Sequence, residues 1–134
     1  NVSNTFVQAA PLFGFEFIMA VPEGIETPAA ANVTHDAKEA AKNADVIVTD
    51  TWVSMGQEGK SLDMFWPYQV TADIMAQAKD HAIFLHCLPM HEWEEVSEEV
   101  AKGPQSAIYD EAENRLHAQK AILAWCLKDA GVIL

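Results

Sequence analysis

The chain has 134 residues, of which 20 are acidic and 8 are basic, so its formal net charge is −12. Half of the residues are hydrophobic and 21% are charged, which is typical of one folded globular domain. So few basic residues argue against a nucleic-acid partner and against attraction to an anionic membrane. No apolar run approaches the length of a transmembrane helix. The two cysteines do not make a disulfide scaffold, which favours a reducing compartment.

The spacing of apolar residues predicts helices alternating with short strands. In chain order we predict a helix over 2–13, a strand over 15–21, a turn-rich loop over 23–32, a helix over 35–43, a strand over 45–49 and a loop over 51–70. A helix that follows Thr71 and runs to about Lys79, a strand over 82–85, a short helix from Ser97, a strand over 106–109 and a helix over 111–129 complete the chain. Thr34 and Thr71 are expected N-caps, and Asp110 with Glu113 has capping-box spacing.

Short apolar strands between helices predict a three-layer α/β fold with a doubly wound parallel sheet. In such sheets ligands bind beyond the carboxyl ends of the strands. Three polar features are expected at that edge: Asp50 with its long loop, the segment 86–89, and the segment 110–115. The chain also begins without Met on a helical pattern, so we expect it to be a piece of a longer protein.

Three side chains at this edge are candidates for chemistry. Asp50 ends an apolar strand, and its carboxylate could hold a cationic amine or cap the following turn. Cys87 lies beside His86, either as a ligand-contacting thiol or as a small apolar side chain; no protease-like signature supports covalent catalysis. Arg115, the only arginine, could polarise a carbonyl oxygen or form a surface ion pair.

Other polar residues are expected to play no part in the chemistry. The histidines and cysteines match no zinc-ligand spacing, so we predict no metal site. The acidic run Glu92, Glu94, Glu95, Glu98 and Glu99 is expected to be a solvated face.

Three ordered motifs resemble the ornithine carbamoyltransferases of the aspartate/ornithine carbamoyltransferase family. They are Asp-Thr-Trp-Val-Ser-Met-Gly at 50–56, His-Cys-Leu-Pro at 86–89 and Glu-Asn-Arg at 113–115. The resemblance runs from Asn1-Val2-Ser3-Asn4 to the last helix. The Ser-Met-Gly element is similar to the form that goes with ornithine, as opposed to aspartate or putrescine.

The resemblance implies carbamoyl transfer from carbamoyl phosphate to the δ-amine of L-ornithine, giving citrulline and phosphate, in arginine biosynthesis or catabolism. By position, Asn1 and Asp50 would hold the α-amino end of ornithine, helped by Ser54 and Met55. Cys87 and Leu88 would border the reacting centre, where main-chain carbonyls meet the carbamoyl NH2 and the δ-amine. Arg115 would bind the carbamoyl oxygen. No metal or organic cofactor is implied.

The resemblance also implies that residues 1–134 are the ornithine-binding domain, without its first strand and without the carbamoyl-phosphate domain. The last helix would pack on that second domain. We therefore expect this chain alone to be inactive, the full-length enzyme to be a homotrimer, and the location to be cytoplasmic, or the mitochondrial matrix in a eukaryote.

Two other functions stay open. The chain could belong to a carbamoyltransferase for another amine or amino acid, or it could be a non-catalytic domain for ligand binding or assembly. A nucleotide-binding domain is a third, weaker interpretation, because no G-x-G-x-x-G follows a strand.

Overall fold

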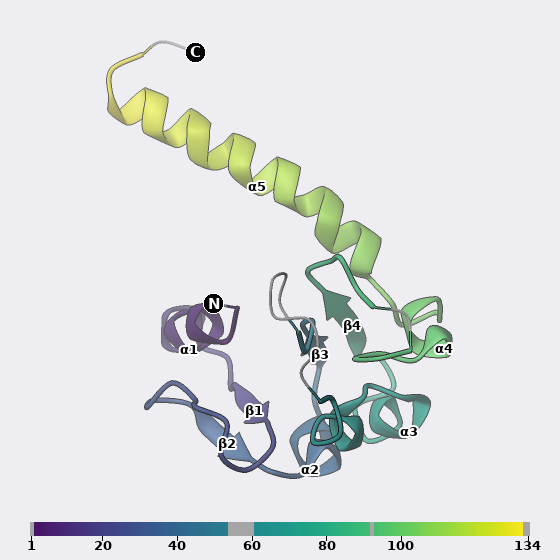
Figure 1. The fold of residues 1–134 in the computed structure, drawn as a ribbon. Coiled ribbons are helices and arrows are strands. Elements are labelled where there is room, and N and C mark those ends of the chain that lie inside the picture. Colours follow the sequence, from purple (N-terminus) through teal and green to yellow (C-terminus); the bar gives the residue numbers. More distant parts are fainter. Residues whose placement is uncertain (1, 54–60, 92, 133–134) are drawn as a thin grey trace.

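Four short strands, all paired in parallel, form the framework of the molecule in a computed structural model that describes residues 2–53, 61–91 and 93–132 (Figure 1). The elements are α1 (Val2–Phe13), β1 (Ile18–Ala20), β2 (Asn32–Thr34), α2 (Ala37–Ala41), β3 (Val46–Thr49), the 3-10 helix η1 (Trp66–Tyr68), α3 (Ala72–Met75), β4 (Ile83–His86), α4 (Glu98–Ala101) and α5 (Ile108–Asp129). The predicted α/β class with parallel strands is confirmed.

Within the described residues the strands form two pairs and not one continuous sheet. β1 pairs with β2, and β3 pairs with β4, from Val46 opposite Ile83 to Thr49 opposite His86. Helix α2 contacts β1 and β2 and also packs on α3, and its Ala41 belongs to the same hydrophobic core as Ile47 of β3. The register of β3 and β4 makes both strands end at the same level, which brings the residues after Thr49 and His86 together.

Three predictions about individual segments were wrong: the strand over 106–109, the cap at Asp110 and the loop and cap over 32–34. Residues 106–109 form no strand: Ser106 makes one isolated bridge to Phe84, the Ala107 amide donates to the Phe84 carbonyl, and α5 begins at Ile108. Asp110 therefore lies inside α5 and cannot be its cap. Asn32–Thr34, predicted to be loop and cap, is strand β2 because it pairs with β1.

The cap of α2 was also misassigned. Asp36 is the N-cap, and its Oδ1 accepts hydrogen bonds from the amides of Lys38 at 2.8 Å and Glu39 at 3.1 Å. Thr34 instead donates its hydroxyl to Glu39 Oε2 at 2.8 Å. Both residues are good caps by type, and the pairing of β2 decides between them. The first strand and the third helix are also shorter than predicted, since β1 spans only Ile18–Ala20 and α3 ends at Met75.

The hydrophobic core lies between the β3–β4 pair and the helices α2, α3 and α4. Its buried members are Ala41, Ile47, Val70, Ile74, Met75, Phe84, Val96, Val100, Ala101 and Ile108. Phe84 of β4 is completely buried, so β4 is the strand most firmly held by packing. The α1 helix contributes no buried residue.

Helix α5 runs away from the rest of the molecule as a long arm (Figure 1). It contacts β4 at its beginning, but further along it leaves Leu116, Ile122, Leu123 and Trp125 exposed. In the described part of the chain, no helix combines the length and apolar character needed to cross a membrane.

Candidate functional site

Asp50 and Cys87 meet at the carboxyl edge of β3 and β4. Each residue directly follows its strand, and the Cys87 Sγ lies 3.2 Å from Asp50 Oδ1, to which the thiol donates a hydrogen bond. The two residues are 37 positions apart in the sequence, so this contact depends on the parallel pairing of the strands. The predicted meeting of these two features at one edge is confirmed by this contact, while their roles remain predictions.

Among the described residues, all hydrogen bonds to the Asp50 carboxylate are made to one of its two oxygens, Oδ1. Its Oδ1 accepts from the Thr51 amide at 2.8 Å and from the Thr51 hydroxyl at 3.4 Å, in addition to the thiol. Among the described residues, Oδ2 has no hydrogen-bond partner. Asp50 is therefore both a turn cap and an exposed acceptor, so the two roles considered from the sequence are compatible.

An aromatic cluster fixes the chain that leaves Asp50. Trp52 stacks on Phe65 with ring centroids 5.7 Å apart and meets Trp66 edge-on at 5.3 Å. Phe65 and Trp66 belong to the return of the long loop toward α3, so the contacts tie its two ends together. The first residues after Asp50 are thus held by packing.

The Cys87 thiol is a poor nucleophile at neutral pH. Cys87 is exposed as a residue, but partial desolvation of its thiol, the hydrogen bond and charge of Asp50, and the charge of Glu111 together raise its pKa from 9.0 to about 11. Because the thiolate is the reactive form, this pKa argues against covalent catalysis. The protonated thiol is instead a hydrogen-bonding group at the carboxyl edge of β3 and β4.

Glu111 is a second carboxylate beside Cys87 that was not among the candidate site residues. It lies in the first turn of α5, and its negative charge contributes to the raised pKa of the Cys87 thiol. Its Oε2 is buried without a hydrogen-bond partner among the described residues. The only sequence signal was its place within the third polar feature, the segment 110–115, from which only Arg115 was chosen as a candidate. Asp50 and Glu111 together make the surroundings of the thiol electronegative.

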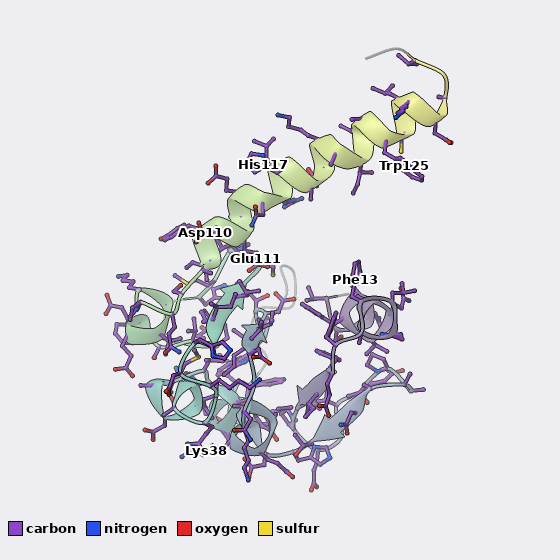
Figure 2. The ribbon with its side chains drawn as sticks, turned by 180° about the vertical axis from the view of Figure 1, so that it is seen from behind. Phe13, Lys38, Asp110, Glu111, His117 and Trp125 are labelled. Atoms are coloured by element: carbon purple, nitrogen blue, oxygen red, sulfur yellow. The ribbon has the colours of Figure 1, made fainter. Side chains whose placement is uncertain are left out.

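Arg115 is not brought to this pair. Since α5 begins at Ile108, Arg115 lies two turns into the helix, and the strand predicted directly before that helix is not formed. Its side chain is exposed, and the described residues include no ion-pair partner for it. Figure 2 shows Glu111 at the base of α5 and His117 further out along the arm, and Arg115 lies between them in sequence.

Leu88 follows Cys87 with a φ of 53°, in the left-handed region that non-glycine residues rarely adopt. Its amide donates to His86 Nδ1 at 2.9 Å. The peptide between Leu88 and Pro89 is cis. Of the remaining residues assigned by resemblance, Asn1, Ser54 and Met55 lie outside the described residues.

Glu95 is not part of a solvated face, as the acidic run predicted, but is fully buried. Its Oε1 accepts from His86 Nε2 at 3.0 Å and from the His91 amide at 2.8 Å. Burial acts to raise the pKa of the Glu95 carboxyl, but these hydrogen bonds outweigh it, so the pKa lies below the usual 4.5. No pattern in the sequence indicates this pair, because His86 ends the apolar strand β4 and Glu95 lies nine residues later, within a polar, irregular segment.

One group of described residues could hold a metal ion. His91, Glu94 and Glu95 offer ligand atoms within 4.8 Å of one another. Oε1 of Glu95 is already occupied by two hydrogen bonds, whereas its Oε2 is buried without a hydrogen-bond partner among the described residues and lies 3.9 Å from His91 Nδ1. Exposed acidic groups often gather in this way without an ion. A separate depression, lined in part by Met75, Lys79 and Gly103, lies at the amino end of β4 and does not adjoin the Asp50–Cys87 pair.

The comparison with protein families decides the affiliation. Residues 1–126 match the family model described as "Aspartate/ornithine carbamoyltransferase, Asp/Orn binding domain". The chain belongs to the aspartate/ornithine carbamoyltransferase family. This match spans nearly the whole sequence, including all three motifs, and the α/β fold agrees with it.

Curated and solved carbamoyltransferases resemble the chain closely. The "Ornithine carbamoyltransferase" of Brucella abortus (strain 2308) is 53% identical over 145 aligned positions, which cover 98% of this chain and 46% of the relative. The crystal structure of the enzyme from Thermus thermophilus is 40% identical with a TM-score of 0.81, covering 90% of this chain and 42% of that one. The enzyme from Gloeobacter violaceus is 37% identical with a TM-score of 0.83, and the match covers 92% of this chain and 47% of that one. The chain thus spans about half the length of the carbamoyltransferases it matches.

Proposed function

We propose that this chain is the ornithine-binding half of an ornithine carbamoyltransferase, which transfers a carbamoyl group from carbamoyl phosphate to the δ-amine of L-ornithine. The observation that carries the proposal is the Asp50–Cys87 pair at the carboxyl edge of β3 and β4, in a chain of this family. The names of the relatives favour ornithine over other acceptors.

The electrostatics of the edge support a cationic acceptor. The carboxylates of Asp50 and Glu111 both act on the thiol, and Oδ2 of Asp50, which has no partner among the described residues, could accept from an ammonium group. In the proposed complex Asp50 binds the α-amino end of ornithine, with Asn1, Ser54 and Met55 completing the contacts. The strong net negative charge of the chain would also favour the approach of a cation.

The reaction requires a neutral δ-amine placed against the carbamoyl carbon. We propose that the protonated Cys87 thiol and the main-chain carbonyl of Leu88 orient this amine and the carbamoyl NH2. The attack then forms the new C–N bond, the C–O bond to phosphate breaks as the carbonyl is restored, and the leaving phosphate takes up the proton that the amine loses. Donors fixed on the carbamoyl oxygen stabilise the charge that develops there.

Arg115 is the proposed donor to the carbamoyl oxygen. It lies four residues after Glu111 and so shares its face of α5, which leads from the edge of the site. The exposed guanidinium would be engaged only when the carbamoyl-phosphate half of the enzyme adjoins α5. The same half would cover the exposed apolar residues of α5, among them Leu123 and Trp125.

Three wider features remain proposals from the family resemblance. They are a homotrimeric enzyme, a cytoplasmic location (or the mitochondrial matrix in a eukaryote), and a role in arginine metabolism. They rest on the resemblance of the three motifs to ornithine carbamoyltransferases alone.

The proposal is tested by a chimera in which residues 1–134 replace the matching segment of the Brucella abortus enzyme. Citrulline formation is measured with ornithine, and carbamoylation is measured with aspartate and putrescine in the same assay. We expect activity with ornithine above that with the other acceptors. A folded chimera that prefers another acceptor would favour another carbamoyltransferase, and one with no activity toward any acceptor would favour a non-catalytic domain.

A further inference from the structure

His86 and Glu95 form the one fully buried pair of polar side chains among the described residues. His86 directly precedes Cys87, so the pair adjoins the candidate site. Both are 0% exposed, and His86 Nε2 lies 3.0 Å from Glu95 Oε1. Histidine and glutamate are rarely buried so completely unless their hydrogen bonds are satisfied. The pair therefore needs a structural or functional reason.

The hydrogen bonds of His86 select a single form of the imidazole. The Leu88 amide can only donate, so Nδ1, at 2.9 Å, must accept and carries no proton. Nε2 then bears the proton of the neutral ring and donates it to Glu95 Oε1. Both ring nitrogens are thereby occupied, and the Cys87 thiol donates elsewhere, to Asp50. His86 is not placed to act as a base for that thiol.

Glu95 is itself firmly anchored. Its carbonyl accepts from the Val70 amide at 3.0 Å, and the neighbouring Val96, which is 1% exposed, forms a parallel bridge with Val70. From this anchor its Oε1 also accepts from the His91 amide at 2.8 Å. One carboxylate oxygen thus ties the side chain at the beginning of the segment 86–91 to the backbone at its end.

Leu88 is the residue that this network constrains. It adopts a φ of 53°, which a leucine rarely adopts without support. The bond from its amide to His86 Nδ1 restrains the plane of the peptide between Cys87 and Leu88. That peptide orients the thiol on one side and leads to the Leu88 carbonyl on the other.

We propose that His86 and Glu95 are positioning residues, which hold the left-handed backbone of Leu88 so that its carbonyl and the Cys87 thiol face the acceptor amine. This inference rests on the proposed function, because it assigns those two groups to the acceptor. The chemical roles remain with Cys87 and Leu88, and the buried pair acts through them.

Two substitutions of His86 separate the two hydrogen bonds. In His86→Asn, the amide oxygen replaces Nδ1 and can still accept from Leu88, but the side chain no longer reaches Glu95. In His86→Gln, the amide nitrogen replaces Nε2 and can donate to Glu95, but no atom accepts from Leu88. In the chimera we expect His86→Gln to lower kcat/KM for ornithine about 10 to 100-fold more than His86→Asn. The KM for carbamoyl phosphate should stay within about twofold in both, since the groups that His86 positions face the acceptor.

A purely structural role predicts a different result. The two variants would then lose activity in proportion to their loss of thermal stability, with no separation between the KM values of the two substrates. Equal kinetic defects in His86→Asn and His86→Gln would overturn the proposal.

Nitrogen-15 NMR of the 134-residue chain tests the geometry without any activity. We expect the shifts of His86 to report a proton on Nε2 and the Leu88 amide to be protected from exchange. Glu95→Gln keeps an oxygen acceptor and should retain that protection, whereas Glu95→Ala should lose it. A proton on Nδ1, or an unprotected Leu88 amide in the unaltered chain, would refute the proposal even if the chimera makes citrulline. An inactive chimera with the expected NMR result would refute the proposed function instead.

Discussion

The raised pKa of Cys87 predicts a specific pattern of thiol reactivity. A shift from 9.0 to about 11 lowers the thiolate fraction at pH 8 from about 10% to about 0.1%, or about 100-fold. A thiolate of higher pKa is intrinsically more nucleophilic. With a Brønsted slope of about 0.4–0.5, the higher pKa increases the rate constant of the thiolate about 8-fold and so offsets part of this loss. Cys87 should therefore react with iodoacetamide about 10-fold more slowly at pH 8 than the same thiol with an unshifted pKa.

Replacing Asp50 by Asn tests the cause of this shift. The substitution removes the charge of Asp50 and weakens its hydrogen bond, while burial, the largest cause, and the charge of Glu111 remain. If half of the shift is lost, the thiolate fraction rises about 10-fold and its nucleophilicity falls about threefold, so alkylation accelerates about threefold. Glu111→Gln should act in the same direction but less, because its charge contributes least among the causes that raise the pKa.

The assay is peptide mapping by mass spectrometry after timed alkylation between pH 6 and pH 10. Cys126 on α5, which is exposed like Cys87, serves as the internal check on reagent and quenching. The Cys87 rate should rise throughout this range without levelling off. A plateau near pH 9, or no change in Asp50→Asn, would show that the Asp50 carboxylate and burial do not keep this thiol protonated.

Three further predictions concern turnover, pH and the core. In the chimera, Arg115→Ala should lower kcat at least about 100-fold if the guanidinium binds the carbamoyl oxygen. Lys120→Ala, on the same helix, should leave kcat near the parent value. Comparable kcat values in the two variants would show that Arg115 is not part of the site. The depressed pKa of Glu95 means that the folded state binds this proton less tightly than the unfolded chain, so its stabilising contribution is present above about pH 4.5 and is lost as the pH falls below it. Urea unfolding at pH 7 and pH 4 should show this loss in the parent and a smaller one in Glu95→Gln, and an equal pH dependence would contradict it. Phe84→Ala should cost about 3–5 kcal/mol in the same assay, because Phe84 is completely buried; a loss below about 1 kcal/mol would mean that β4 is not the centre of the core.

Sequence-based prediction succeeds where a signal repeats along the chain. The apolar runs before Asp50 and His86 correctly predicted β3 and β4, and their common end correctly predicted that Asp50 and Cys87 would meet. The helices were found from spacing, including α1, which continues through Pro11. These are local periodic patterns, reinforced by the burial of one face.

The failures occur where a single long-range contact decides the outcome. Residues 106–109 follow the pattern of an apolar strand, but only one bridge, between Ser106 and Phe84, forms before α5 begins. Because α5 begins at Ile108, earlier than predicted, Arg115 lies further along the helix, away from the edge. Glu95 sits in an acidic run and is buried because His86 and the His91 amide both donate to it. A carboxylate in a polar segment carries no mark of its partner, so composition alone classed it with its solvated neighbours.

Asp50, at the carboxyl edge beside Cys87, is proposed to bind the cationic acceptor. The most direct test of this role is the ornithine dependence of citrulline formation by Asp50→Asn and by Asp45→Asn in the chimera. Asp45 precedes β3 at the opposite end and pairs with Lys79 at 2.8 Å, so it is a matched control on the same strand. We predict a loss of at least about 10-fold in kcat/KM for ornithine with Asp50→Asn and little change with Asp45→Asn. Equal values for the two variants would show that Asp50 does not bind the acceptor.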